Sequence, residues 1–250
     1  MSHKLIAGNW KMNGRRAEAQ SFAAALLAHV GGKAPPCDML ICPPATLIGT
    51  LGQALAGAAV ALGGQDCHAQ AKGAYTGDVA AAMLADLGCA YVIVGHSERR
   101  AAHHETDAEV AAKAKAAAAA GLVPIVCLGE SQAQREAGET LDVVGRQLAG
   151  SLPDAIDPAR CVVAYEPIWA IGSGAIPSSQ EIGQAHGHLR AALVARFGAA
   201  GGAAVRLLYG GSAKPSNAAE ILRIPSVDGL LVGGASLAAD DFWAICKACA

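Results

Sequence analysis

The stretch CVVAYEPIWAIGSG, residues 161–174, says most about how this chain folds. Its first five residues form a continuous apolar run, which is typical of a parallel strand buried on both faces. The carboxylate of Glu166 follows at the carboxyl end of that strand, and Pro167, Gly172 and Gly174 come after it. Proline fixes φ while glycine permits movement. The block therefore predicts a base beneath a hinged lid, rather than a surface glutamate beside an ordinary loop.

Similar apolar runs recur along the whole chain, and Ala-rich helical segments lie between most of them. The predicted strands include residues 5–7, 39–41, 60–62, 91–94, 123–126, 162–164, 207–209 and 229–232. The clearest predicted helices are residues 15–30, 106–120, 180–197 and 237–249. Such alternation produces a doubly wound sheet or a closed barrel, and eight strands close a barrel with a packed interior. We predict the α/β class, with a closed eight-stranded parallel (β/α)8 barrel as a single domain over residues 1–250.

Composition excludes several classes of function. The 250 residues are 53% hydrophobic with a formal net charge of -2, and no basic cluster predicts nucleic-acid binding. No apolar stretch reaches the roughly 20 residues that cross a bilayer. The first residues show no signal-peptide pattern. We expect a soluble, cytoplasmic protein that binds no membrane.

The eight cysteines and the paired histidines do not form a metal-ligand pattern. Cys246 and Cys249 have the spacing of a redox motif, but they lie in a terminal helical pattern without a partner pair, so we interpret them as structural. His103 and His104 have no further ligand at metal spacing, and no metal site is predicted. Four other cysteines lie in apolar strand-like runs, where thiols behave as small hydrophobes: Cys42, Cys89, Cys127 and Cys161.

Polar residues and glycines cluster directly after the predicted strands. In a barrel the carboxyl ends of the strands meet on one rim, which is where active sites of this architecture form. Their joint placement after separate strands predicts an active site there. The residues are Asn9, Lys11, Gln65, Asp66, His96, Ser97, Glu98, Glu166, Gly210, Gly211, Ser212, Gly233 and Gly234.

With these residues in view, the chain closely resembles the triosephosphate isomerase family over essentially its full length. The resemblance implies interconversion of dihydroxyacetone phosphate and D-glyceraldehyde 3-phosphate through an enediolate, without cofactor or metal, in glycolysis and gluconeogenesis. The blocks that carry it are GNWKMN (8–13), GAYTG (73–77), VGHSERR (94–100), AYEP (164–167), YGGS (209–212) and VGGASL (232–237).

The resemblance also implies a role for each polar residue of the reacting centre. Glu166 resembles the base, and His96 resembles the electrophile that polarises the carbonyl oxygen. A short helix is expected to start at residue 97, and its positive end disfavours an imidazolium, so His96 is expected to stay neutral. Lys11 resembles the ammonium that stabilises the oxyanion. Asn9 would orient substrate oxygens, and Glu98 would position Lys11.

The remaining resemblances concern the phosphate and the base. Gly172, Ser212, Gly233 and Gly234 match the phosphate contacts of the family, where backbone N–H groups near a helix start would bind the dianion. Cys127 matches a position on the rim beneath the base, and we assign most of its role to packing.

The loop over residues 65–79 resembles the segment that inserts into a second subunit near Lys11 and Asn13. Thr76 lies in this loop, so the resemblance implies a homodimer. Asp78 and Arg99 resemble a pair that braces the region.

The lid departs from the family at its far hinge, which reads Ala175-Ile176-Pro177. In the family the hydroxyl at Tyr209 latches the closed lid by bonding a backbone N–H at the position of Pro177. Proline has no N–H. We therefore expect the Ser212 hydroxyl, bonding the backbone of Gly174, to carry more of the latching.

Two rival functions fit the same barrel. A Schiff-base aldolase would use Lys11 as nucleophile, which requires a lowered pKa that a neighbouring Glu98 opposes. A non-catalytic phosphate-binding barrel would have no use for a base. The joint presence of Asn9, Lys11, His96 and Glu166 favours the isomerase.

Overall fold

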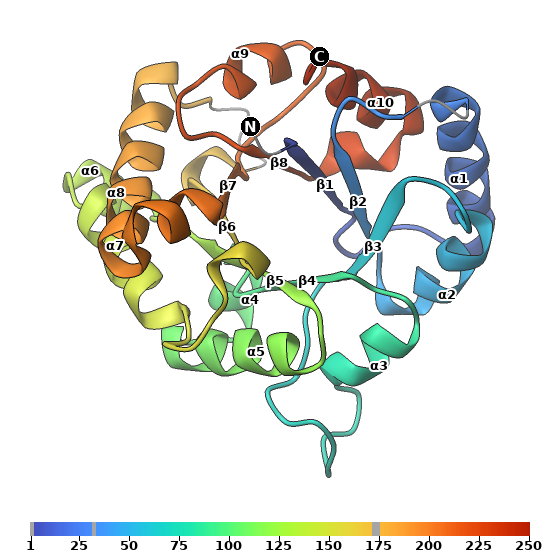
Figure 1. Cartoon of the computed structure of the whole chain (residues 1–250), viewed down its shortest axis with the longest axis horizontal. Coiled ribbons are helices and arrows are strands. Elements are labelled where there is room, and N and C mark those ends of the chain that lie inside the picture. Colours follow the sequence, from blue (N-terminus) through green and yellow to red (C-terminus); the bar gives the residue numbers. More distant parts are fainter. Residues whose placement is uncertain (1–2, 32–33, 172–175) are drawn as a thin grey trace.

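A computed structural model describes residues 3–31, 34–171 and 176–250, and it contains a closed parallel barrel (Figure 1). The strands pair in sequence order from β1 to β8, and β1 closes the ring by pairing with β8 as well as β2. The predicted (β/α)8 barrel is confirmed, and a doubly wound sheet is excluded because no strand is left at an edge. The strands are β1 Leu5–Asn9, β2 Asp38–Cys42, β3 Val60–Gly64, β4 Tyr91–Val94, β5 Val123–Leu128, β6 Val162–Tyr165, β7 Arg206–Tyr209 and β8 Gly229–Val232.

Helices surround the barrel as an outer ring (Figure 1). Ten α-helices lie in the described part of the chain: α1 Arg16–Val30, α2 Ala45–Ala54, α3 Ala81–Asp86, α4 Ser97–Ala102, α5 Asp107–Ala119, α6 Gln132–Glu136, α7 Thr140–Ser151, α8 Ser179–Ala204, α9 Ala218–Leu222 and α10 Ala239–Lys247. Three short 3-10 helices accompany them: η1 Pro158–Arg160, η2 Ile168–Ala170 and η3 Gly234–Leu237.

The predicted helix starts coincide with local capping signals. Thr106 accepts from the N–H of Glu109 while the Glu109 side chain accepts from Thr106, a capping box that begins α5. Ser178 and Glu181 form the same arrangement at α8. Gly198 interrupts α8 with φ 74°, so the regular helix ends near the predicted position 197.

The helix predicted over residues 237–249 begins two residues later in the structure, as α10 Ala239–Lys247. Ala238 is extended, with φ -106° and ψ 123°, and it separates η3 from α10. The glycines after β8 therefore lead into a short 3-10 turn. They do not face the end of a long helix.

Alternate strand residues build two packed layers. Inward-facing side chains such as Ala7, Leu40 and Ile125 fill the barrel, while their neighbours Ile6, Ile41 and Val126 pack against the helices. This alternation is expected of a small barrel whose interior is closed by side chains. The filled interior leaves the rim as the place for chemistry.

None of the helices described has both the length and the apolar character needed to span a bilayer.

Candidate active site

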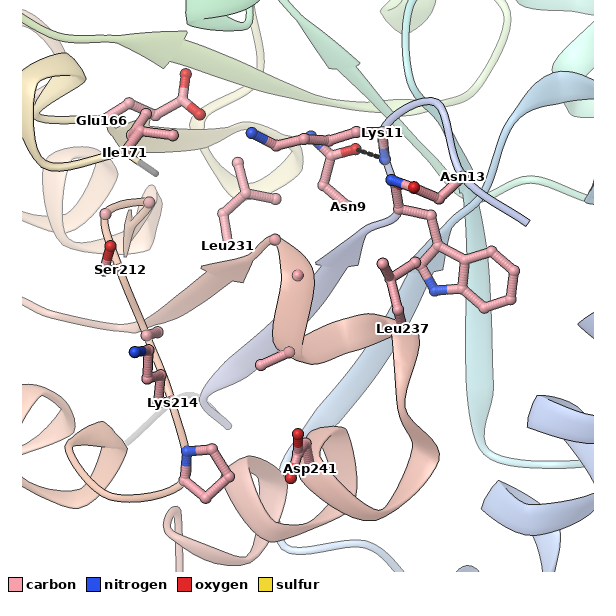
Figure 2. A pocket seen from close by; sticks show the side chains of 18 of the residues that line it. Asn9, Lys11, Asn13, Glu166, Ile171, Ser212, Lys214, Leu231, Leu237 and Asp241 are labelled. Atoms are coloured by element: carbon pink, nitrogen blue, oxygen red, sulfur yellow. Dashed lines mark hydrogen bonds between the residues drawn. The ribbon is translucent and has the colours of Figure 1, made fainter. Parts of the chain in front are cut away.

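A cavity of about 690 Å³ opens at the carboxyl ends of the strands. The residues that line it come from the end of β1, from β8, and from the segments after β1, β4, β6, β7 and β8. Glu166, Lys11 and Ser212 lie around this opening, and the Lys11 side chain extends toward Glu166 (Figure 2). Among the residues described, no three His, Cys, Asp or Glu side chains are grouped so that they could hold a metal ion.

Glu166 is placed by the end of β6 and by two glycines that leave room for it. A Cβ at Gly129 would lie 1.7 Å from the Glu166 carbonyl oxygen, and one at Gly210 would lie 2.8 Å from Glu166 Cγ. A larger residue at position 129 would displace the backbone of Glu166, and one at position 210 would displace its side chain. Glu166 is only 1% exposed.

The carboxylate of Glu166 is ionised and held by two donors. Its Oε2 accepts from the backbone N–H of Ser97 at 3.0 Å, and its Oε1 lies 2.9 Å from His96 Nε2. Burial raises the pKa of Glu166, but His96, the Ser97 N–H and the charge of Lys11 outweigh burial and lower it below the usual value. A buried, ionised carboxylate at a cavity mouth is suited to take a proton.

His96 caps the first turn of α4. Its Nδ1 accepts from the backbone N–H of Glu98 at 3.2 Å, so its single ring proton belongs on Nε2, facing Glu166. Burial lowers the pKa of His96, whereas the Glu166 carboxylate raises it, and the net direction in this pair is upward. A second proton would nonetheless have to sit on Nδ1, directly against the Glu98 N–H. We therefore infer a neutral ring.

Lys11 occupies a strained backbone position with φ 52°, a region that non-glycine residues rarely adopt. Asn9 Oδ1 accepts from the Lys11 N–H at 3.0 Å, and Gln65 Nε2 donates to the Lys11 carbonyl at 2.9 Å. The Lys11 ammonium lies 2.5 Å from Glu98 Oε1. These contacts aim the ammonium along the cavity.

The structure also places Asn9 and Asn13 at the cavity. Asn9 is buried at the end of β1, and Asn13 is exposed and donates to the Trp10 carbonyl at 2.8 Å.

Three of the four predicted phosphate contacts meet on one wall. Ser212 follows β7, and Gly233 and Gly234 follow β8; all three line the cavity. A Cβ at Gly233 would lie 3.7 Å from Lys11 Cε, so this wall adjoins the ammonium. Gly172 lies outside the described residues.

The supporting residues lie behind the site. Cys127 is fully buried in the barrel interior, and burial together with the charge of Glu166 raises the pKa of its thiol. Tyr209 is buried at the end of β7, and among the described residues its hydroxyl has no hydrogen-bond partner. Gly174, the predicted partner of Ser212, lies outside the described residues. Ser212 Oγ donates instead to the Ala170 carbonyl at 2.8 Å.

The predicted subunit loop extends away from the barrel after β3 (Figure 1). Thr76 is exposed near its tip, beside Tyr75, whose ring lies 3.9 Å from that of His68. The predicted pair of Asp78 with Arg99 is not formed within the chain. Asp78 lies 3.9 Å from His68, and Arg99 pairs instead with Asp66 and Glu105.

Several residues that line the cavity were not predicted from the sequence, and two of them are Leu231 and Lys214. Leu231 was assigned to a strand, but its inward register near the carboxyl end of β8 places it in the cavity (Figure 2). Lys214 lies two positions after Ser212, and a cation so close to predicted phosphate glycines was a signal that could have been used.

Comparison with known proteins agrees with this geometry. The family model described as triosephosphate isomerase matches residues 4–249. The triosephosphate isomerase of Ruegeria pomeroyi is 58% identical over 248 residues, covering 99% of this chain and 98% of that protein. That of Afipia carboxidovorans is 59% identical over 245 residues, covering 98% and 97%.

A solved structure shows the same likeness in three dimensions. The crystal structure of triosephosphate isomerase from Bartonella henselae superposes with a TM-score of 0.90 at 45% sequence identity, covering 98% of both chains. The family match spans nearly the whole chain, and the fold and rim residues agree with it. The chain belongs to the triosephosphate isomerase family.

Proposed function

We propose that the chain interconverts dihydroxyacetone phosphate and D-glyceraldehyde 3-phosphate. The observation that carries this proposal is the 2.9 Å contact between Glu166 Oε1 and His96 Nε2 at the cavity mouth. It brings a carboxylate and a ring N–H donor to one point. Moving a carbonyl between adjacent carbons requires such a base and such a donor.

The proposed reaction begins when substrate replaces the resting contact of Glu166 with His96. Glu166 takes the proton from the carbon beside the carbonyl, and the electron pair moves onto the carbonyl oxygen as an enediolate forms. His96 Nε2 donates to that oxygen. The ammonium of Lys11 offsets the negative charge that grows on that oxygen. Return of the proton to the neighbouring carbon completes the isomerisation.

The substrate phosphate is proposed to bind the wall formed by Ser212, Gly233 and Gly234. A Cβ at Gly234 would meet nothing within 4 Å, and one at Gly233 would meet Lys11 Cε at 3.7 Å, so this wall is open and adjoins Lys11. Backbone N–H groups in such a glycine segment can bind an anion. This arrangement separates the phosphate end of the substrate from the carbons beside Glu166.

We also propose a homodimer formed through the loop at residues 65–79. The tip of this loop is exposed, and Met12, next to Lys11, is 96% exposed. Large exposed apolar residues gathered on one side often mark a protein interface. Gln65 at the base of the loop bonds the Lys11 carbonyl, so the proposed interface is connected directly to the site.

A cytoplasmic location and a place in glycolysis and gluconeogenesis are part of the same proposal. All eight cysteines are free thiols, as expected in a reducing compartment. Both pathways require interconversion of the two triose phosphates.

A coupled assay tests the proposed activity. Dihydroxyacetone phosphate is supplied as substrate, and an excess of glyceraldehyde-3-phosphate dehydrogenase with NAD reports the product as NADH. Turnover should persist after dialysis against EDTA, because no step uses a metal. An inactive, folded preparation would reject the proposal.

The Schiff-base alternative has its own discriminating experiment. Borohydride would trap an imine between Lys11 and a ketose phosphate, and mass spectrometry would detect the added mass. We expect no adduct, because the Glu98 carboxylate lies 2.5 Å from Lys11 Nζ and pairs with its ammonium.

His96 is expected to be neutral at pH 7, with its proton on Nε2. The reason is that Nδ1 accepts the Glu98 N–H. Nitrogen-15 NMR of labelled histidine distinguishes the two ring nitrogens directly, and His96→Gln identifies the signal. An imidazolium signal for His96 at pH 7 would contradict the assignment.

Tyr209→Phe is expected to lower kcat/KM by less than about twofold, because Pro177 offers no N–H to its hydroxyl. Ser212→Ala is expected to cost more, roughly 2–10-fold, since a net hydrogen bond contributes about 0.5–1.5 kcal/mol. Steady-state kinetics of the two variants, measured side by side, decide the order. A tenfold loss for Tyr209→Phe beside a nearly silent Ser212→Ala would refute it.

A further inference from the structure

Three thiols meet where the C-terminal helix packs near the start of β2. Cys37 directly precedes β2, Cys246 lies in α10, and Cys249 follows α10. The Cys37 thiol donates to the Cys246 carbonyl at 3.8 Å. The backbone N–H of Cys249 donates to the same carbonyl oxygen at 3.1 Å, so Cys37 and Cys249 meet at one atom although they lie far apart in the sequence. The neighbouring thiol shifts the pKa of each of the two groups.

The cluster is accessible from one side only. Cys37 and Cys246 are buried, whereas Cys249 is partly exposed. Cys37 stands at the amino-terminal end of its strand, while the active-site cavity lies at the carboxyl ends. In Figure 1, α10 lies on the opposite side of the barrel from the loop at residues 65–79. The exposed thiol is therefore remote from both the cavity and the proposed subunit interface.

We propose that Cys37 and Cys249 form a reversible disulfide when the protein meets a peroxide, which ties the C-terminal segment to β2. Cys249 is the thiol that the oxidant reaches first, and Cys37 is its neighbour at the Cys246 carbonyl. This makes the pair a modification site separate from the catalytic one.

The chemistry balances with hydrogen peroxide as the oxidant. The Cys249 sulfur attacks one peroxide oxygen, the O–O bond breaks, and one water leaves as a sulfenic acid forms. The Cys37 sulfur then attacks the Cys249 sulfur. The S–O bond breaks, and hydroxide leaves with the Cys37 proton as a second water. Two thiols are oxidised by two electrons, and one peroxide is reduced to two waters.

The electrostatic surroundings of the two thiols make formation of the disulfide slow. The hydrogen bond with Cys246 and burial raise the pKa of Cys37 and outweigh the Cys249 thiol, which lowers it. The Cys37 thiol and burial raise the pKa of Cys249. The charge of Lys4 acts in the opposite direction on Cys249. Since the thiolate is the reacting form, the pair remains reduced under ordinary conditions. Only sustained oxidant converts it.

The bridge would close a loop over most of the chain, from before β2 to beyond α10. A long closed loop restricts the unfolded chain strongly and so stabilises the fold. We expect Tm to rise by about 5–10 °C on oxidation. The basal activity is expected to stay unchanged, because the bridge does not touch the cavity.

The experiment treats the intact protein with hydrogen peroxide at mildly alkaline pH, then blocks remaining thiols. Trypsin cleaves after Lys247, which separates Cys249 from Cys246, so mass spectrometry of the non-reduced digest identifies the linkage. We expect residues 248–250 joined to the tryptic peptide 34–72, and fragmentation of that product should place the bridge at Cys37 and not at Cys42 or Cys67. A reducing agent should reverse both the linkage and the gain in Tm.

Two variants test which cysteines form the bridge. Cys249→Ala changes a partly exposed residue and should abolish the linkage and the rise in Tm, whereas Cys246→Ala, the matched control, should retain both. If Cys246→Ala folds poorly, the digest of the peroxide-treated wild-type protein still identifies which cysteines are linked. A bridge between Cys246 and Cys249, or overoxidation of Cys249 without any bridge, would overturn the proposal.

Discussion

Replacing Glu166 by glutamine is expected to lower kcat by about 10²–10⁴-fold, the usual contribution of a general base. Glutamine has nearly the same shape, so it can still accept from the Ser97 N–H, but it cannot take a proton at neutral pH. KM should change far less, because the proposed phosphate wall is untouched. The coupled assay measures both constants.

A second readout isolates the proton step. In deuterated water the wild type should exchange the substrate C–H with solvent, and NMR would show the loss of that signal. Glu166→Gln should exchange at least about 10²-fold more slowly. Glu136→Gln, an exposed change on α6, is the matched control and should behave as wild type. Near-normal turnover of a clean Glu166→Gln preparation would remove Glu166 from the role of base.

Thr76→Arg is expected to yield monomers with strongly reduced activity. The exposed tip would carry a charge into the proposed partner pocket, where an unpaired buried charge costs about 3–5 kcal/mol. Each 1.4 kcal/mol is about tenfold in Kd, so dissociation should increase by roughly 10²-fold or more. Loss of the partner loop would loosen Lys11, and a misplacement of about 1 Å can lower the rate by roughly 10²-fold.

Sedimentation velocity across a range of concentrations measures the assembly, and the coupled assay measures the rate on the same samples. Gln132→Arg adds the same charge on α6, away from the loop (Figure 1), and should remain dimeric and active. A monomeric wild type would show that the homodimer proposal is wrong.

Local chemistry explains why some features could be predicted accurately. The capping boxes at Thr106 and Ser178 begin their helices within the residues that form them. The boundary near residue 197 follows from Gly198, whose φ of 74° few other residues tolerate. The extended Ala238 carries no such local signal, so the division between η3 and α10 could not be read from the chain.

The sequence by itself determined the eight buried strands, their parallel alternation with helices and the set of polar residues at one rim. Those features depend on hydrophobic runs and short-range capping, and both signals lie within the sequence of each segment. Only the tertiary structure decided which polar atoms meet: His96 Nδ1 with the Glu98 N–H, the Lys11 ammonium with Glu98, and the Cys37 thiol with the Cys246 carbonyl. Such contacts join residues far apart in the chain. They depend on strand register and side-chain direction at distances of a few ångströms, which no local pattern encodes.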